Sequence, residues 1–153
     1  MIVVSDTSVI TLLIHVGQER LLQRLHGAVL IPDAVHRELL QTHSRLPDFL
    51  EVRQAGNRHF VARLEMELDL GEAEAIVLAK ETDADLLLID EKLGRQVALR
   101  EGIRIAGVVG LVVEAKHRRL IDSVRNLLAR LESEAGFRVS DSVREEACHL
   151  AGE

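Results

Sequence analysis

Two aspartates that each follow a short apolar run are the residues of this sequence best placed to do chemistry. Asp6 follows the largely apolar run Ile2–Ser5, and Asp90 follows the run Leu86–Ile89. Continuous apolar runs are typical of strands that are covered on both faces of a parallel sheet. Active sites of open parallel sheets lie outside the carboxyl ends of the strands, so both carboxylates are predicted at one edge. Oxygen ligands of this kind suit a hard divalent cation such as Mg²⁺.

Three glutamates in helical patterns could add to such a site. Glu38 lies in a helix that starts after Pro32, while Glu72 and Glu74 lie at the start of an alanine-rich helix. Taken alone, Glu38 is typical of an exposed helix position, and an acid in a first helical turn complements the helix dipole. The small residues around Glu72 and Glu74 predict that their helix lies close to another element. Two positions apart, these side chains differ by about 200° around the helix axis, so they cannot point equally into one pocket.

The elements that must position these acids follow from the apolar patterning. Apolar runs predict five strands, at residues 2–4, 28–31, 50–53, 86–89 and 103–106. Helical spacing predicts helices between them and, towards the end of the chain, at 108–115, at 121–131 and after Ser140. This alternation indicates an α/β fold of three layers, α/β/α, around a mainly parallel central sheet. We expect a single domain over residues 1–153.

Composition narrows the classes of function. Hydrophobic residues make up 47% of the chain, but with three Phe, no Tyr and no Trp a base-stacking platform of the RNA-recognition or OB type is excluded. The chain carries 25 acidic and 19 basic side chains, a formal net charge of −6, whereas proteins that hold nucleic acid through phosphate contacts are usually basic. A nucleic-acid ligand would therefore require positive charge from another source.

Cysteine and histidine usage gives no sign of other metal or redox chemistry. The single cysteine, Cys148, allows neither a disulfide within the chain nor a multi-cysteine zinc site. No two of the seven histidines have the i, i+4 zinc spacing with an intervening glutamate. No apolar run approaches the roughly 18 residues of a membrane span, and the first residues lack the features of a secretory leader. We therefore expect a cytoplasmic protein with no membrane partner.

The order and spacing of several short motifs resemble the PIN-domain family, in particular VapC-like toxins and the PIN-like branch known as DUF3368. The resemblance covers nearly the whole chain. It is carried by Val4–Ser8, Ile31–Leu39, Leu70–Ile76, Leu88–Glu91 with Gly94 and Arg95, Gly107–Gly110, Glu114–Lys116 and Gly136–Ser140. The resemblance implies a PIN-like three-layer fold and a ribonuclease that depends on a divalent cation.

The resemblance also implies a particular set of site residues. Four acids would hold one or two Mg²⁺ or Mn²⁺ ions and carry the catalysis: Asp6, Glu38, Glu72 and Asp90. Glu74 and Glu91 are contenders as cation ligands, and Ser8 would steady the first aspartate. Such cations lower the pKa of bound water and polarise the phosphoryl oxygen, so water can hydrolyse a phosphodiester. The cation would then supply the positive charge that the acidic composition lacks.

The partners that the resemblance implies are an RNA substrate, a second copy of the chain in a homodimer, and a small antitoxin protein. In this reading the chain is the toxin of a toxin–antitoxin pair. An arginine of the antitoxin could pair with such a cluster of carboxylates and cover it. A basic stretch at Lys116, Arg118 and Arg119 could contact RNA phosphates, although a solvated helix end explains the same charges.

An alternative function keeps the fold without the catalysis: a silent PIN-like module that acts by binding a protein partner. Three other α/β classes fit less well. Haloacid dehalogenase chemistry requires a second aspartate two residues after the first, where this chain has Ser8. A receiver domain requires paired acids after the first strand, where Asp6 stands alone. A dinucleotide fold requires a glycine-rich turn there, but the first glycine is Gly17.

Overall fold

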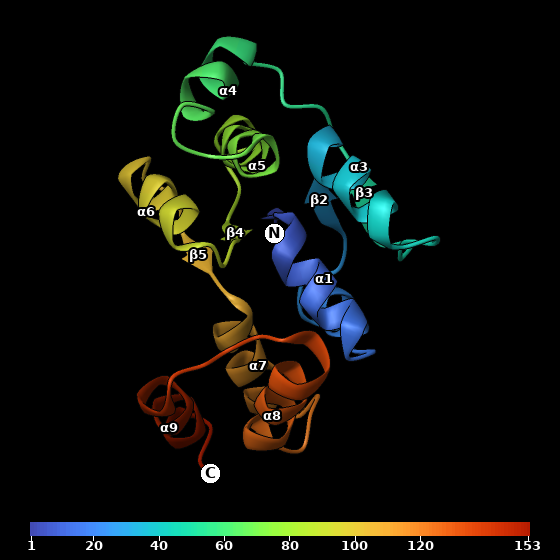
Figure 1. Ribbon diagram of the computed structural model, residues 1–153, viewed down its shortest axis with the longest axis vertical. Helices are drawn as coiled ribbons and strands as arrows, with labels where there is room; N and C mark the ends of the chain where they lie inside the picture. Colours follow the sequence, from blue (N-terminus) through green and yellow to red (C-terminus); the bar gives the residue numbers. More distant parts are fainter.

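A five-stranded sheet forms the centre of the computed structural model, which describes residues 1–153 (Figure 1). The strands are β1 (Val3–Ser5), β2 (Val29–Ile31), β3 (Leu50–Val52), β4 (Leu86–Leu88) and β5 (Ile105–Ala106). All neighbours are parallel, in the order β3-β2-β1-β4-β5. In the central strand β1, Val4 lies opposite Leu30 of β2 and Leu87 of β4. The five strands predicted from apolar runs are therefore present.

Nine helices connect and cover the strands. They are α1 (Thr7–His15), α2 (Arg20–His26), α3 (Asp33–Thr42), α4 (Arg58–Leu64), α5 (Leu70–Glu81), α6 (Lys92–Arg100), α7 (Val108–His117), α8 (Val124–Ala135) and α9 (Asp141–Leu150). None of the nine has the length and apolarity that a membrane-spanning helix needs. Figure 1 shows α4 and α5 at one end of the molecule and α8 and α9 at the other.

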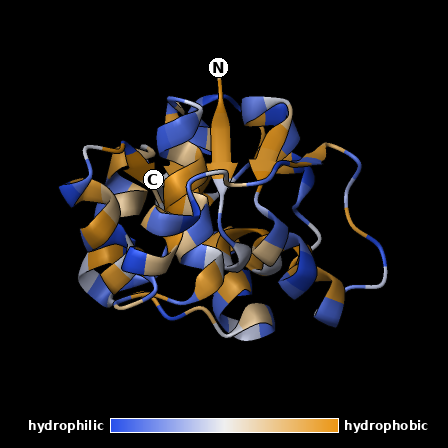
Figure 2. Cartoon of the chain, turned by 90° about the horizontal axis from the view of Figure 1, so that it is seen from above, coloured by the Kyte–Doolittle hydropathy of each residue, from blue (hydrophilic) through white to orange (hydrophobic).

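Each face of the sheet is covered by its own group of helices. Successive side chains of a strand point to opposite faces. Val3 packs into a core built chiefly with α1, α2, α7, α8 and α9, whereas Val4 packs into a core built with α4, α5 and α6. The strands are largely hydrophobic, while the helices carry both kinds of residue (Figure 2). The fold is thus the predicted three-layer α/β/α arrangement around a parallel sheet.

One helix is shifted along the chain from its predicted position at 121–131. α8 begins at Val124, because the hydroxyl of Ser123 accepts a 3.1 Å hydrogen bond from the amide of Asn126 and caps the first turn. The helix ends at Gly136, whose φ of 68° is left-handed. The capping groups at both ends, rather than the apolar spacing, set the bounds of this helix.

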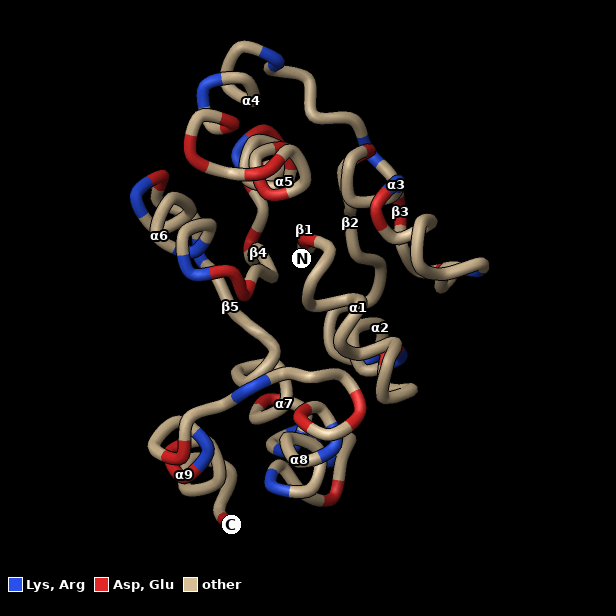
Figure 3. The backbone as a smooth tube through the Cα atoms, viewed as in Figure 1, with Lys and Arg blue, Asp and Glu red and all other residues tan.

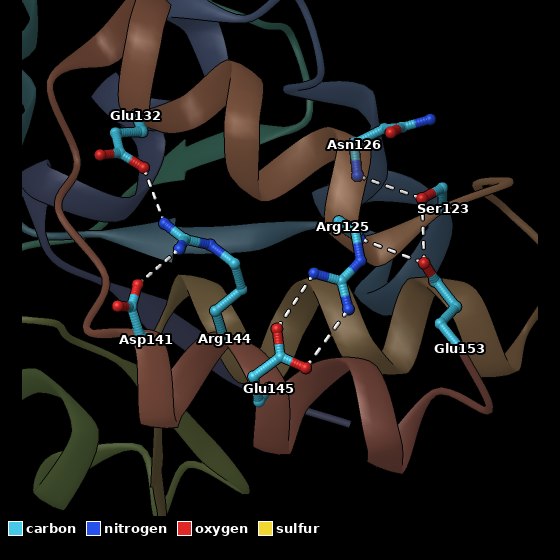
Figure 4. Close-up of polar contacts among 8 residues, drawn as sticks. All are labelled: Ser123, Arg125, Asn126, Glu132, Asp141, Arg144, Glu145 and Glu153. Atoms are coloured by element: carbon cyan, nitrogen blue, oxygen red, sulfur yellow. Dashed lines mark hydrogen bonds and ion pairs between the residues drawn. The ribbon is translucent and has the colours of Figure 1, made fainter.

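Ion pairs join α9 to α8 in the C-terminal part of the chain (Figure 4). Arg144 of α9 donates to Glu132 of α8 at 2.8 Å, and Arg125 of α8 donates to Glu145 of α9 at 3.1 Å. The hydroxyl of Ser140 caps α9, as the sequence predicts. Exposed pairs of this kind are worth about 1 kcal/mol or less each, so apolar packing supplies most of the stability of this layer.

Candidate active site

Asp6 lies at the carboxyl end of the central strand and is almost completely buried, with 2% of its surface exposed. Its amide donates a 3.0 Å hydrogen bond to the carbonyl of Leu88, which holds the ends of β1 and β4 side by side. Its side chain caps α1 by accepting from the amide of Val9 at 3.4 Å. Burial raises the pKa of Asp6 to about 8; the Val9 amide lowers it, and the charges of Asp90 and Glu72 raise it.

Asp90 follows β4 at the same edge of the sheet and links this strand to α7. Its Oδ2 accepts a 3.0 Å hydrogen bond from the amide of Val108, at the N-terminus of α7. Nearby, Nη1 of Arg95 donates to the carbonyl of Ile89 at 2.9 Å. Burial raises the pKa of Asp90, while the Val108 amide and the Arg95 charge oppose this rise. Oδ2 of Asp90 therefore accepts a hydrogen bond from the first turn of α7, whereas Oδ1 accepts none.

Glu38 reaches the same region from α3. Its Oε2 accepts a 2.6 Å hydrogen bond from the hydroxyl of Thr7, the first residue of α1. Its Oε1 lies against α5, where a Cβ built on Gly71 would stand only 2.5 Å away. The sequence alone places Glu38 on a solvated helix face. In the structure its side chain is instead held beside Thr7, the residue that follows Asp6.

Glu72 comes from the first turn of α5, where Asp69 caps the helix by accepting from the Glu72 amide at 2.9 Å. Burial and then the charge of Asp69 raise the pKa of Glu72 to about 7. Its Oε2 is buried and has no hydrogen-bond partner. A buried carboxylate oxygen without a partner is costly unless a proton or a cation satisfies it. Among the acids of this region, Glu72 is thus the one with an unsatisfied buried oxygen.

Three of these four acids line a small polar cavity of about 120 Å³. Its lining has no hydrophobic or basic side chain and consists of Asp6, Thr7, Ser8, Glu38, Asp69, Glu72 and Glu91. Asp90 is outside this lining but close enough for its charge to act on Asp6. Figure 3 shows the same gathering, with acidic positions at the end of β1, on α5 and after β4. A cavity lined only by acids and hydroxyls attracts cations.

The two contending glutamates lie in different places. Glu74 is buried, with 2% of its surface exposed, and lies outside the cavity. Its Oε1 accepts from the amide of Ala34 at 2.8 Å, and its Oε2 pairs with Arg58 at 2.8 Å. Glu74 therefore caps α3 and joins it to α4. Glu91 does line the cavity, from an exposed position before α6, and its charge raises the pKa of Asp6.

Ser8 lines the cavity, but it does not hold Asp6 through a hydrogen bond. The contact that steadies the Asp6 carboxylate comes from the amide of Val9, one residue further on. The hydroxyl that does orient an acid is that of Thr7, and the acid is Glu38. The support for Asp6 that was expected from Ser8 thus comes from the amide of Val9.

The basic stretch does not meet the acids. Lys116, Arg118 and Arg119 lie at the C-terminal end of α7, whereas Asp90 contacts the N-terminus of that helix, about 12 Å away along its axis. Lys116 pairs with Glu153 at 3.4 Å, and Arg118 pairs with Glu114 on its own helix at 2.9 Å. These charges are therefore largely engaged within the molecule.

The donor set fits a hard divalent cation, although the carboxylates are not drawn together. No three His, Cys, Asp or Glu side chains form a ready metal-binding group. The fit rests on the unpartnered Oε2 of Glu72 and on the buried carboxylate of Asp6, because a cation would stabilise both in ionised form. Glu38 and Glu72 have long side chains whose rotation can bring oxygens to an ion. Oxygen ligands with room for water are what Mg²⁺ and Mn²⁺ prefer.

Two residues of the cavity were not among those singled out in the sequence. Asp69 had a usable signal, because an aspartate just before an apolar helical pattern is a typical N-cap. Thr7 had none, because its partner Glu38 is 31 residues away in the chain. Only the fold shows that these two side chains meet.

The carboxyl ends of the two central parallel strands thus lie at an acid-lined cavity, where sites of open α/β sheets are found. The family model DUF3368, described as a PIN domain, matches residues 2–153. The chain therefore belongs to the PIN-domain family, whose members are in general nucleases. This membership confirms the resemblance seen in the sequence motifs. No curated protein and no solved structure matches the chain.

Proposed function

We propose that this protein is a ribonuclease that depends on Mg²⁺ or Mn²⁺. The observation that supports this most directly is that Glu72, whose Oε2 is buried and unpartnered, lines the same cavity as the buried Asp6. Ionising two carboxyl groups in one small cavity is costly, and a bound cation offsets that cost. Membership of a family of nucleases supports phosphodiester hydrolysis as the reaction.

In this proposal four acids hold the cation: Asp6, Glu38, Glu72 and Asp90. Glu91 stands at the exposed rim of the cavity as a further ligand. When bound, the cation supplies an activated water and neutralises charge on the phosphoryl group. The chain contributes the orientation of the ligands, through the Thr7 hydroxyl on Glu38 and the Val108 amide on Asp90.

The reaction is hydrolysis of an RNA phosphodiester. Water adds to phosphorus, the bond from phosphorus to the 3′ oxygen breaks, and a proton from the water ends on that oxygen. The products are a 5′-phosphate and a 3′-hydroxyl. Because the cavity has no aromatic side chain, recognition rests on phosphate and shape rather than on base stacking.

The same proposal includes the biological setting. The chain acts as the toxin of a toxin–antitoxin pair, as a homodimer, and a basic side chain of a small antitoxin covers the cavity. The lining supports this charge complementarity, since it contains five acids and no basic residue. Recovery of the native protein without any small partner would count against the pairing, and light scattering tests the dimer.

A second candidate function is a catalytically silent module that binds a protein partner. The observation in its favour is that no three acids stand in a ready metal-binding arrangement. The two functions differ in one measurable respect, since a silent module leaves RNA intact at any concentration of divalent cation.

The test is cleavage of single-stranded and structured RNA in Mg²⁺, in Mn²⁺ and in EDTA. We expect cleavage that requires the cation and is lost in both Asp6→Asn and Asp90→Asn. The control is Asp122→Asn, because that side chain is exposed and makes no hydrogen bond. Equal cleavage by the wild type and the two site variants would rule out the acid-based mechanism, and cation binding without cleavage would favour the silent module.

A further inference from the structure

Three glycines face three of the acids. A Cβ built on Gly71 would stand 2.5 Å from Oε1 of Glu38, and its three nearest atoms all belong to that side chain. A Cβ built on Gly94 would stand 2.6 Å from Oε2 of Glu72 and 2.7 Å from the Ile89 methyl. Each carboxylate oxygen thus occupies the space that a side chain at the glycine would need.

The third pair joins Gly107 and Asp90. A Cβ on Gly107 would overlap Oδ1 of Asp90, and it would also lie 2.8 Å from Nη1 of Arg95. Val108, next in the chain, donates its amide to Oδ2 of the same carboxylate. The Gly107–Val108 segment therefore fixes both oxygens of Asp90, one by a hydrogen bond and one by leaving room for it.

Backbone conformation does not explain glycine at these three positions. The glycines with positive φ are Gly17, Gly27, Gly102, Gly136 and Gly152, and none of them has a neighbour within 4 Å of a built Cβ. Gly71 and Gly94 lie in helices, where glycine costs about 1 kcal/mol relative to alanine. Gly107 has a φ of −107°, which any residue adopts. What the three share is the carboxylate oxygen in the place of a side chain.

We infer that Gly71, Gly94 and Gly107 are positioning residues, which set the carboxylates of Glu38, Glu72 and Asp90 by leaving space for one oxygen of each. This inference rests on the proposed cation site. The three glycines come from α5, α6 and the start of α7, so they hold the acids from three separate elements. A methyl group at any of them would push one carboxylate out of its place.

At Gly71 and Gly94, a methyl group would displace the facing carboxylate group rather than the backbone. Glu38 and Glu72 are long side chains that rotate at little cost, whereas Gly71 and Gly94 lie in helices packed against their neighbours. Alanine at Gly71 would therefore leave the fold intact and move the acid, whereas alanine at Gly94 would also displace the buried Ile89 side chain. Groups that orient metal ligands without binding the ion typically change metal affinity by about 10- to 100-fold when altered.

The decisive variant is Gly71→Ala, because Glu38 alone occupies the space. Calorimetric titration with Mn²⁺, without RNA, is expected to show affinity at least about tenfold weaker than that of the wild type. The matched control is Gly110→Ala, at an exposed helical glycine with open space around it, which should bind Mn²⁺ like the wild type. Equal affinity of Gly71→Ala and the wild type would overturn the inference.

A double-variant cycle shows whether the glycine acts through its acid. In a Glu38→Gln background, adding Gly71→Ala should cost little further affinity, because the carboxylate that the methyl displaces is already gone. A loss as large as in the wild-type background would mean that the methyl acts through general distortion of α5, and would overturn the inference.

A crystal structure of Gly71→Ala without metal separates this inference from the proposed function. We expect the Glu38 carboxylate to leave its position and its hydrogen bond to Thr7. An unmoved carboxylate beside a shifted α5 backbone would overturn the role of the glycine, whatever the protein binds. A displaced carboxylate in a protein whose wild type binds no Mn²⁺ would support the role of the glycine and refute the cation site.

Discussion

The hydroxyl of Thr7 donates a 2.6 Å hydrogen bond to Oε2 of Glu38, and this bond joins the first residue of α1 to α3. Thr7 also follows Asp6 directly, so a single turn of chain places two of the acids. Glu38 is thereby held at the cavity although it lies on a helix that is otherwise half exposed. Residues outside the proposed ligand set thus decide where the proposed ligands stand.

Replacing Thr7 by valine should lower RNA cleavage by about tenfold or more, because Glu38 loses the donor that orients it. Thermal stability should change little, since a single half-buried hydrogen bond contributes about 1 kcal/mol. Thr7→Ser keeps the hydroxyl and should retain most of the cleavage. Loss of activity in Thr7→Ser equal to that in Thr7→Val would show that the methyl group, and not the hydrogen bond, is what matters.

Asp6→Asn should make the metal-free protein more stable while it abolishes cleavage. At pH 8 and above the wild type carries a buried negative charge at this position, and asparagine removes the cost of that charge. For a chain of this size a gain of 1 kcal/mol corresponds to about 2–4 °C in the melting temperature. Calorimetry in EDTA above pH 8 measures the shift, with Asp122→Asn as the exposed control. A fall in melting temperature would contradict the role of burial at Asp6.

Without divalent cations the free energy of unfolding should fall as the pH rises from about 5 to 8. The pKa values of Asp6 and Glu72 are about 8 and 7 in the folded protein, whereas in an unfolded chain such groups titrate near pH 4. In this window the folded state binds more protons than the unfolded state, so stability decreases with pH and levels off above 8. Urea unfolding in EDTA at several pH values measures the slope.

Saturating Mn²⁺ should oppose that fall, because the cation replaces the protons and binds best above pH 8. The double variant Asp6→Asn with Glu72→Gln should give a flatter curve in EDTA, with Asp90 supplying the remaining slope, and no gain from Mn²⁺. A wild-type curve that rises between pH 5 and 8 would show that the two carboxyl groups are not buried as described.

Glu74 and Glu72 should respond to substitution in opposite ways. Glu74→Ala leaves the Ala34 amide and Arg58 without their partner, and should destabilise the fold by about 2–4 kcal/mol. Glu72→Gln removes an unpartnered carboxylate, and should weaken Mn²⁺ binding without loss of stability. Urea unfolding and Mn²⁺ titration of both variants measure the contrast. Strong loss of Mn²⁺ binding in a folded Glu74→Gln variant would contradict the assignment.

The strands could be predicted because each depends on a local pattern, a short apolar run, and the two strand-end aspartates because they directly follow two of these runs. Which of Glu72 and Glu74 faces the cavity could not, because the answer depends on where α3 and α4 pack around α5. The spacing of 72 and 74 predicts only that the two point in different directions. Likewise, the contact of Gly71 with Glu38 joins two elements far apart in sequence, and no local pattern marks it.

The pairing of β1 with β4 also decides when the site comes into existence. β1 is synthesised first, yet β4 begins only at Leu86, so a growing chain carries Asp6 and Glu38 long before Asp90 is made. Strands so far apart in sequence pair late, because closing the long intervening loop costs entropy. Until β4 has been synthesised and paired with β1, the nascent polypeptide therefore lacks the complete set of acids. For the ribonuclease proposed above, this delay would leave the unfinished protein inactive towards the messenger that encodes it.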